Sequence, residues 1–130
     1  MAEDFVSYGL AVRLKECGFD EPCEYCYDER GSIAVTEDPE CFNSEKQLPI
    51  YARATLWQAH KWLREEMRIA VNVTAHDGGY YTWEVVFLPD APKTDGDLRP
   101  DVRLYTDYES ALSAGIEAVL GILGKTTKKT

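Results

Sequence analysis

The clearest hydrophobic pattern in the chain is an alternation of apolar and polar positions over residues 69–87, interrupted by Asp77-Gly78-Gly79. Alternation at period two is typical of half-buried strands, and a three-residue loop containing glycine is a common hairpin connection. The pattern predicts two antiparallel strands joined by loop 77–79. With both apolar sets on one face, the expected pairs are Ala75 with Tyr81, Val73 with Trp83, Val71 with Val85, and Ile69 with Phe87.

A shorter hairpin is predicted nearer the N-terminus. Residues 23–28 and 32–36 alternate in polarity around Arg30-Gly31, where glycine tolerates a positive φ. Residues 37–49 are polar without clear periodicity, which predicts a connection. Residues 102–105 are expected to add one more short strand.

Helical periodicity predicts a first helix over about 4–17. Asp4 is its expected N-cap, and Gly18 is in place to end it as a left-handed residue. A third helix is expected to open at the capping box Thr106-Asp107-Tyr108-Glu109 and to run to about residue 123.

A second helix is predicted over about 50–68, because apolar residues there recur at helical spacing. The stripe expected to be buried comprises Ala52, Leu56, Ala59, His60, Leu63 and Met67.

The predicted order is α-β-β-α-β-β-(β)-α. Strands joined by tight turns favour an antiparallel sheet. We therefore expect an α+β fold, with one antiparallel sheet of four to five strands and three helices packed mainly on one face. A chain of 130 residues fits one domain. The expected domain is 1–125, followed by a disordered polar tail, 126–130.

Composition and charge change this picture only in part. The chain is 45% hydrophobic with a net charge of −9, of which −8 falls in residues 1–49. An acidic protein is repelled by phosphates, so direct nucleic-acid binding is disfavoured. The acidic N-terminus and the absence of a 20-residue apolar run predict a cytoplasmic protein.

Four cysteines are then expected to be reduced thiols. Cys23 and Cys26 form a C-x-x-C pair and are a weak zinc candidate, but a second pair with ligand spacing is lacking. We therefore expect no metal site, no cofactor and unrelated structural thiols. The sequence also contains no phosphate loop, Rossmann fingerprint or His-Glu-x-x-His motif.

The predicted second helix carries a basic stripe with a tryptophan in its middle. An aromatic anchor flanked by cations favours docking of a protein with an acidic surface. The alternative is that the long cationic stems lie over the tryptophan and pair with acids of residues 20–45. The candidate partner-binding residues are Arg53, Trp57, Lys61, Arg64 and Arg68.

The predicted third helix is apolar over most of its circumference. Such a helix is either central in its own chain or covered by another subunit. Both a buried helix and a homodimer contact through this helix stay open. The two apolar faces comprise Ala111, Ala114, Gly115, Ala118 and Ile122, and Leu112, Ile116, Val119 and Leu123.

The segments LWQAHKWLRE (56–65), GYYTWE (79–84), YESALSAGI (108–116) and GFDEPC (18–23) resemble small uncharacterised proteins encoded in phage-like and mobile regions of gut anaerobic bacteria. The resemblance covers most of the chain. It implies an accessory or interaction role, and it brings no known activity, cofactor or catalytic residue that could be carried over to this chain.

Three functional hypotheses follow from the sequence. The first is a small non-enzymatic interaction or accessory protein. The second is an acidic inhibitor that mimics nucleic acid, which the charge of residues 1–49 favours. The third is an enzyme whose site is assembled only by folding, from residues among Cys26, His60, His76 and Glu84.

Overall fold

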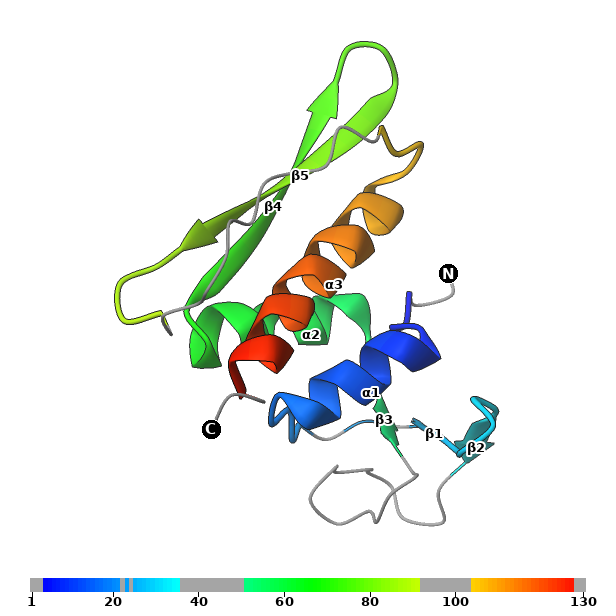
Figure 1. Ribbon diagram of the computed structural model, residues 1–130. Coiled ribbons are helices and arrows are strands. Elements are labelled where there is room, and N and C mark those ends of the chain that lie inside the picture. The colour runs from blue at the N-terminus through cyan, green and yellow to red at the C-terminus, as the bar shows by residue number, and fades with distance from the viewer. Residues whose placement is uncertain (1–3, 22, 24, 36–50, 92–103, 128–130) are drawn as a thin grey trace. The chain divides into compact units, whose positions relative to one another are not determined.

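A computed structural model describes residues 4–21, 23, 25–35, 51–91 and 104–127, and the fold is α+β. The elements in chain order are α1 (Tyr8–Glu16), β1 (Tyr25–Tyr27), β2 (Ile33–Val35), β3 (Tyr51–Arg53), α2 (Leu56–Glu66), β4 (Ile69–His76), β5 (Tyr80–Phe87) and α3 (Tyr108–Thr127) (Figure 1). They form two compact units, residues 1–55 and 56–130. The single domain over 1–125 stays a prediction.

The prediction of one continuous sheet is wrong for the described strands, which form two separate antiparallel sheets. One has the order β2-β1-β3, and the other consists of β4 and β5 alone. The first sheet is completed by β3, which pairs with β1 across a long sequence separation. A further short strand is predicted at 102–105. Tyr105 forms an isolated antiparallel bridge with Tyr81, and residues 102–103 lie outside the described residues.

In the first unit, α1 begins later than expected. Its N-cap is Ser7, whose hydroxyl accepts a hydrogen bond from the Leu10 amide at 3.2 Å. The Asp4 prediction is therefore wrong, because a helix starts where a side chain satisfies its first amides. The predicted end is confirmed. Gly18 has a φ of +95°, and the Phe19 amide donates to the Leu14 carbonyl at 2.9 Å, as a Schellman cap requires.

The short hairpin of the first unit is confirmed over its central residues. β1 and β2 pair with Cys26 opposite Ala34, and Gly31 has a φ of +78°. The Asp28 carboxylate accepts hydrogen bonds at 2.9 Å from the amides of Arg30 and Ser32. A side chain that caps its own turn fixes the loop locally. The connection predicted at 37–49 lies outside the described residues.

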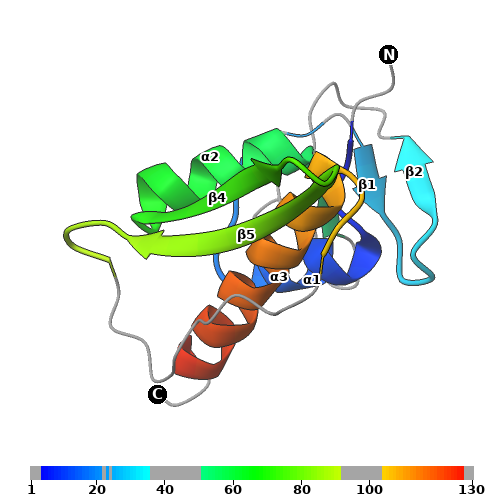
Figure 2. The same cartoon turned by 90° about the horizontal axis from the view of Figure 1, so that it is seen from above.

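In the second unit, the long hairpin has the predicted register throughout, and Gly79 adopts the left-handed conformation with a φ of +80°. α3 packs against both strands (Figures 1 and 2). Gly115 makes the closest approach: a Cβ there would lie 2.5 Å from Val71 Cγ1. Glycine thus permits the helix to contact the sheet directly.

α3 begins one residue later than the capping box implied. Asp107 is the capping residue, because its carboxylate accepts a hydrogen bond from the Ser110 amide at 2.7 Å. The helix continues through Thr127, beyond the predicted end near 123, so 126 and 127 are helical and do not belong to a disordered tail. Its own chain buries one broad face, consisting of Ala111, Leu112, Gly115, Ile116, Val119, Leu120 and Leu123. The homodimer contact stays a prediction.

The second predicted helix is the largest correction. Residues 51–53 form β3, and α2 starts only at Leu56. Burial alternates over 51–54, with Ala52 and Ala54 inside, because β3 is hydrogen-bonded to β1. Within α2 the buried residues are Leu56, Ala59, Trp62 and Leu63. In the described part of the chain, no helix is long and apolar enough to cross a membrane.

Candidate functional site

Three of the five predicted partner-binding residues share one face of α2. Trp57, Lys61 and Arg64 occupy positions i, i+4 and i+7 of this helix, and all three are exposed. Because residues at these spacings lie above one another on a helix, they form a continuous surface. We call these three residues the α2 face.

Arg53 and Arg68 do not belong to the α2 face. Arg53 lies on β3, in the other unit. Arg68 follows the end of α2 in the left-handed conformation, with a φ of +59°, and its Nε donates to the Pro89 carbonyl oxygen at 3.2 Å. The predicted stripe of five is therefore wrong as a single helical surface, since it assumed a helix over the whole of 50–68.

Trp57 is held in place by an aromatic neighbour from α3. Its indole is 49% exposed and stacks on the Tyr108 ring, with centroids 5.6 Å apart and planes inclined by 28°. Tyr108 in turn meets Tyr81 of β5 edge to face, at 6.2 Å and 78°. We call Trp57, Tyr81 and Tyr108 the aromatic surface. Stacking restricts the indole before any partner arrives, which lowers the entropy lost on binding.

Sequence reasoning missed Tyr81 and Tyr108 as members of this surface. Tyr81 was expected on the inward face of its strand, and Tyr108 was treated only as part of a helix start. Both are half-buried. The sequence shows that both are aromatic residues near the start of an element. Their contacts with each other and with Trp57 depend on how α2, α3 and β5 pack.

The cations of the α2 face are not neutralised within the described chain. Neither Lys61 nor Arg64 forms an ion pair with another described residue. Among the described residues, Trp57 stacks on Tyr108, and the cation–π contacts involve Lys15 and Arg53. Pairing of the cations with acids of residues 20–45 stays a prediction, because most of these acids lie outside the described residues. Lys61 and Arg64 are exposed, and Glu65, one turn after Lys61, is exposed beside them.

His60 lies on α2 one turn after Trp57, with the two rings 6.4 Å apart. Burial and the nearby positive charge of Arg64 lower the pKa of His60 below its usual range, and a hydrogen bond with the Val71 backbone opposes this shift only in part. The imidazole is therefore neutral at pH 7. Its buried Nε2 and the buried Nε1 of Trp83 have no hydrogen-bond partner among the described residues.

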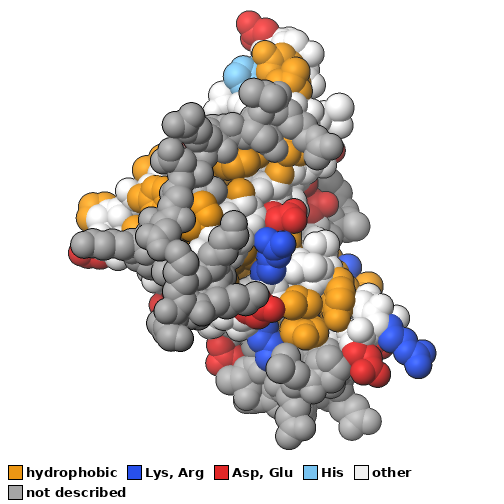
Figure 3. All heavy atoms as spheres, in the orientation of Figure 1, with side chains coloured by type: hydrophobic (Ala, Val, Ile, Leu, Met, Phe, Trp, Pro, Cys, Tyr) orange, Lys and Arg blue, Asp and Glu red, His pale blue; other side chains and the backbone are white. Residues whose placement is uncertain are grey.

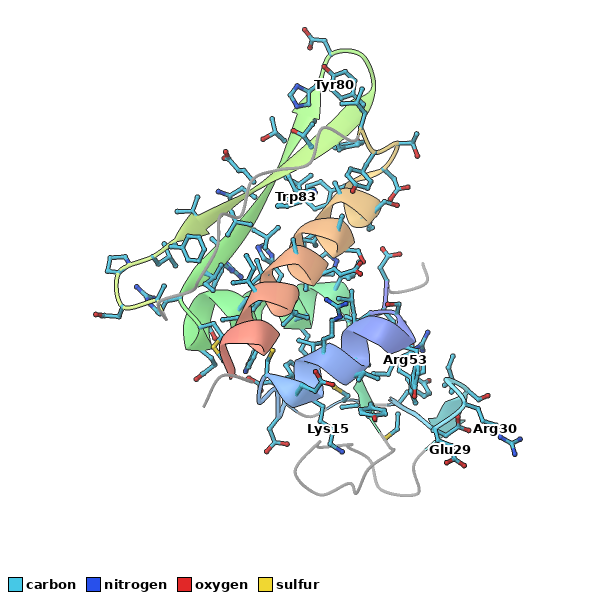
Figure 4. All side chains as sticks on the ribbon, in the orientation of Figure 1. Lys15, Glu29, Arg30, Arg53, Tyr80 and Trp83 are labelled. Carbon is cyan, nitrogen blue, oxygen red and sulfur yellow. The ribbon has the colours of Figure 1, made fainter. Side chains whose placement is uncertain are left out.

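Hydrophobic side chains form much of the visible surface over the β4–β5 hairpin (Figure 3). Trp83 lies between β5 and α3 and is only 5% exposed (Figure 4). Val86 and Phe87, at the end of β5, are 41% and 43% exposed. Trp83 therefore belongs to the core, whereas Val86 and Phe87 form an apolar surface that does not include residues of the aromatic surface.

Arg53 is the centre of an aromatic cluster in the first unit. Its guanidinium carbon lies 3.8 Å from the Phe5 ring centroid, and its Nε donates to the Tyr27 hydroxyl at 3.2 Å. That hydroxyl donates to the Val6 carbonyl at 2.6 Å. The charge is thus stacked and hydrogen-bonded within its own unit, and Arg53 acts there as a structural residue.

The cysteines differ from the expectation of four thiols, because Cys26 is disulfide-bonded. In that state its sulfur is not a thiolate ligand for zinc. The Cys23 thiol donates to the Glu21 carbonyl at 3.5 Å. Burial raises the pKa of Cys17 to about 11, with Glu16 adding to the shift. The described residues contain no group of three His, Cys, Asp or Glu able to hold a metal ion.

The residues suggested for an enzyme site belong to four different elements. Cys26 belongs to the first unit, and His60, His76 and Glu84 belong to the second. His76 stacks on Tyr80 with centroids 4.6 Å apart, and its Nε2 is hydrogen-bonded to the Thr82 hydroxyl at 2.8 Å. These contacts place His76 in the packing of the hairpin near its turn. Glu84 is exposed on β5.

Comparison with known proteins adds no relative: no protein-family model, curated protein or solved structure matches the chain.

Proposed function

We propose that this chain is a small non-enzymatic interaction or accessory protein that binds another protein through the α2 face. The observation that carries the proposal is Trp57, which is half-exposed on the helix yet fixed by its stack on Tyr108. A solvent-exposed tryptophan whose side chain is already ordered is typical of the residues that contribute most of the binding energy at protein interfaces.

The charges support the same surface. Lys61 and Arg64 follow Trp57 along the same face of the helix, and neither forms an ion pair with a described acid. Cations at the rim of an aromatic anchor favour a partner with an acidic surface and increase the rate of association. The whole chain carries a net charge of −9. An acidic partner is therefore repelled by the molecule as a whole, and these two cations favour its approach to the α2 face.

The other two hypotheses draw less support from the structure. The nucleic-acid mimic depends on acids of residues 1–49, half of which lie outside the described residues: Glu3, Glu24, Glu37, Asp38, Glu40 and Glu45. The enzyme hypothesis depends on a set of side chains that the described contacts do not assemble.

The test is selection of binders from a displayed peptide library by immobilised wild type, Trp57→Ala and a matched control, Phe87→Ala. Phe87 is also an aromatic residue and about as exposed, at 43%, but lies at the end of β5. Wild type and the control are expected to enrich the same peptides. Loss of an interface hot spot costs about 2 kcal/mol or more, or about 30-fold in affinity, so Trp57→Ala should enrich none of them.

A Trp57→Ala protein that keeps its circular dichroism spectrum and selects the same peptides as wild type would show that the α2 face is not the binding surface.

A further inference from the structure

We propose that the aromatic surface, together with the cations of the α2 face, binds an extended proline-rich peptide segment that carries acidic residues at one end. The inference rests on the proposed function and specifies the chemistry of its partner. It rests on the juxtaposition of three rings from three elements with two cations that no described acid neutralises.

The rings have the geometry that a proline-rich segment requires. Trp57 and Tyr108 are nearly parallel, and Tyr81 stands at 78° to Tyr108. Two ring planes at a steep angle present a flat face beside an edge, against which successive prolines of a polyproline II helix can pack. Such segments dock on aromatic surfaces and lose little entropy because they are already extended.

Polar atoms of the same residues fit the backbone of that ligand. The hydroxyls of Tyr81 and Tyr108 make no hydrogen bond with another described residue. A polyproline II segment has no internal hydrogen bonds, so its carbonyl oxygens are available as acceptors. Tyrosine hydroxyls beside the ring faces can donate to these carbonyls.

Charge assigns the position of the acidic residues. On α2, the exposed Lys61 and Arg64 outnumber the one acid of this face, Glu65, whereas Asp107 and Glu109 flank Tyr108 in the sequence. Asp107 is held as a carboxylate, because hydrogen bonds from Ser110 lower its pKa. Acidic ligand residues are therefore favoured over α2 and disfavoured over the start of α3.

Tryptophan fluorescence provides the assay. Of the three tryptophans, Trp57 is 49% exposed, whereas Trp62 and Trp83 are each 5% exposed, so a ligand on the aromatic surface changes the signal of Trp57 first. The probes are a synthetic peptide with a proline-rich stretch and an acidic end, a copy with alanine for proline, and a copy with lysine for each acid.

The acidic proline-rich peptide is expected to bind, and both altered peptides should bind at least about tenfold more weakly. Lys61→Glu with Arg64→Glu should weaken the acidic peptide by a similar factor. Arg30→Glu, which alters an exposed cation on the first hairpin, is the control for charge and should leave binding unchanged. Tyr108→Leu, which removes the ring that orders Trp57, should also weaken binding.

The failures are distinguishable. Equal binding of the alanine peptide, still lost in Trp57→Ala, would overturn the proline assignment and leave the proposed function intact. Equal binding of the lysine peptide would overturn the charge assignment. Absence of any binding that depends on Trp57, both here and in the library selection, would overturn the inference and the proposed function together.

Discussion

The contact of Gly115 with the hairpin provides the sharpest test of the fold. A Cβ at this position would lie 2.5 Å from Val71 Cγ1 and 3.4 Å from two atoms of Trp83. Carbon atoms pack favourably at about 3.5–4.0 Å, so Gly115→Ala forces the helix and strand apart or moves Val71 off its rotamer. Val71 is 1% exposed, which leaves its side chain little room to yield.

The expected magnitude is the difference between two opposing effects. Overpacking a core by one methyl group costs about 1–3 kcal/mol. Alanine in place of glycine within a helix returns about 0.5–1 kcal/mol. Gly115→Ala is therefore expected to lower the free energy of unfolding by about 1–2 kcal/mol. Urea denaturation followed by circular dichroism measures this as a midpoint lowered by about 0.5–1 M, given the usual slope for small domains.

The control makes the same chemical change without the clash. Gly9 lies in the first turn of α1, and a Cβ there would lie 4.0 Å from the Ser7 hydroxyl oxygen. Gly9→Ala should leave stability unchanged or raise it by up to about 1 kcal/mol. A Gly115→Ala protein as stable as wild type would refute the reasoning.

A double-mutant cycle identifies the contact responsible. Val71→Ala removes the methyl group that the new Cβ would meet. The losses from Gly115→Ala and Val71→Ala should then combine to less than their sum, by about 1 kcal/mol. Additive losses would show that the close approach to Val71 is not the cause.

Three further predictions concern single groups. Because the pKa of His60 is lowered from 6.5, the unfolded chain takes up a proton that the folded chain resists. Stability should be full above about pH 6.5 and fall below it, and His60→Gln should reduce this fall in urea midpoints measured at pH 7.5 and 5.5. Arg68→Gly relieves a left-handed residue with φ +59° but removes the Pro89 hydrogen bond, so stability should rise by no more than about 1 kcal/mol; a loss would show that the hydrogen bond is worth more than the strain. With its pKa raised to about 11, Cys17 should react with iodoacetamide at pH 8 far more slowly in the native protein than in urea, and equal rates, read by peptide mass spectrometry, would contradict its burial.

The long hairpin of the second unit and the end of α1 in the first could be predicted from the sequence, because their signals are local. The register of β4 and β5 follows from side-chain alternation and a glycine loop, both contained within 69–87. The end of α1 follows from Gly18, whose positive φ closes the helix over hydrogen bonds no more than five residues long. A one-residue slip in such a hairpin would expose its apolar set, so the pattern admits one pairing.

The division into two sheets, the strand β3 and the aromatic surface were decided by tertiary structure. Residues 51–53 fit a helical pattern, and the hydrogen bonds that make them a strand come from β1, at the other end of a long connection. That pairing removed Arg53 from the α2 face and stacked it on Phe5. Tyr108 and Trp57 are far apart in the chain, and only the packing of α3 beside α2 and β5 makes them neighbours. Alternation and capping are fixed by residues a few positions apart, whereas a contact between distant segments depends on how all the intervening elements pack, which no local pattern records.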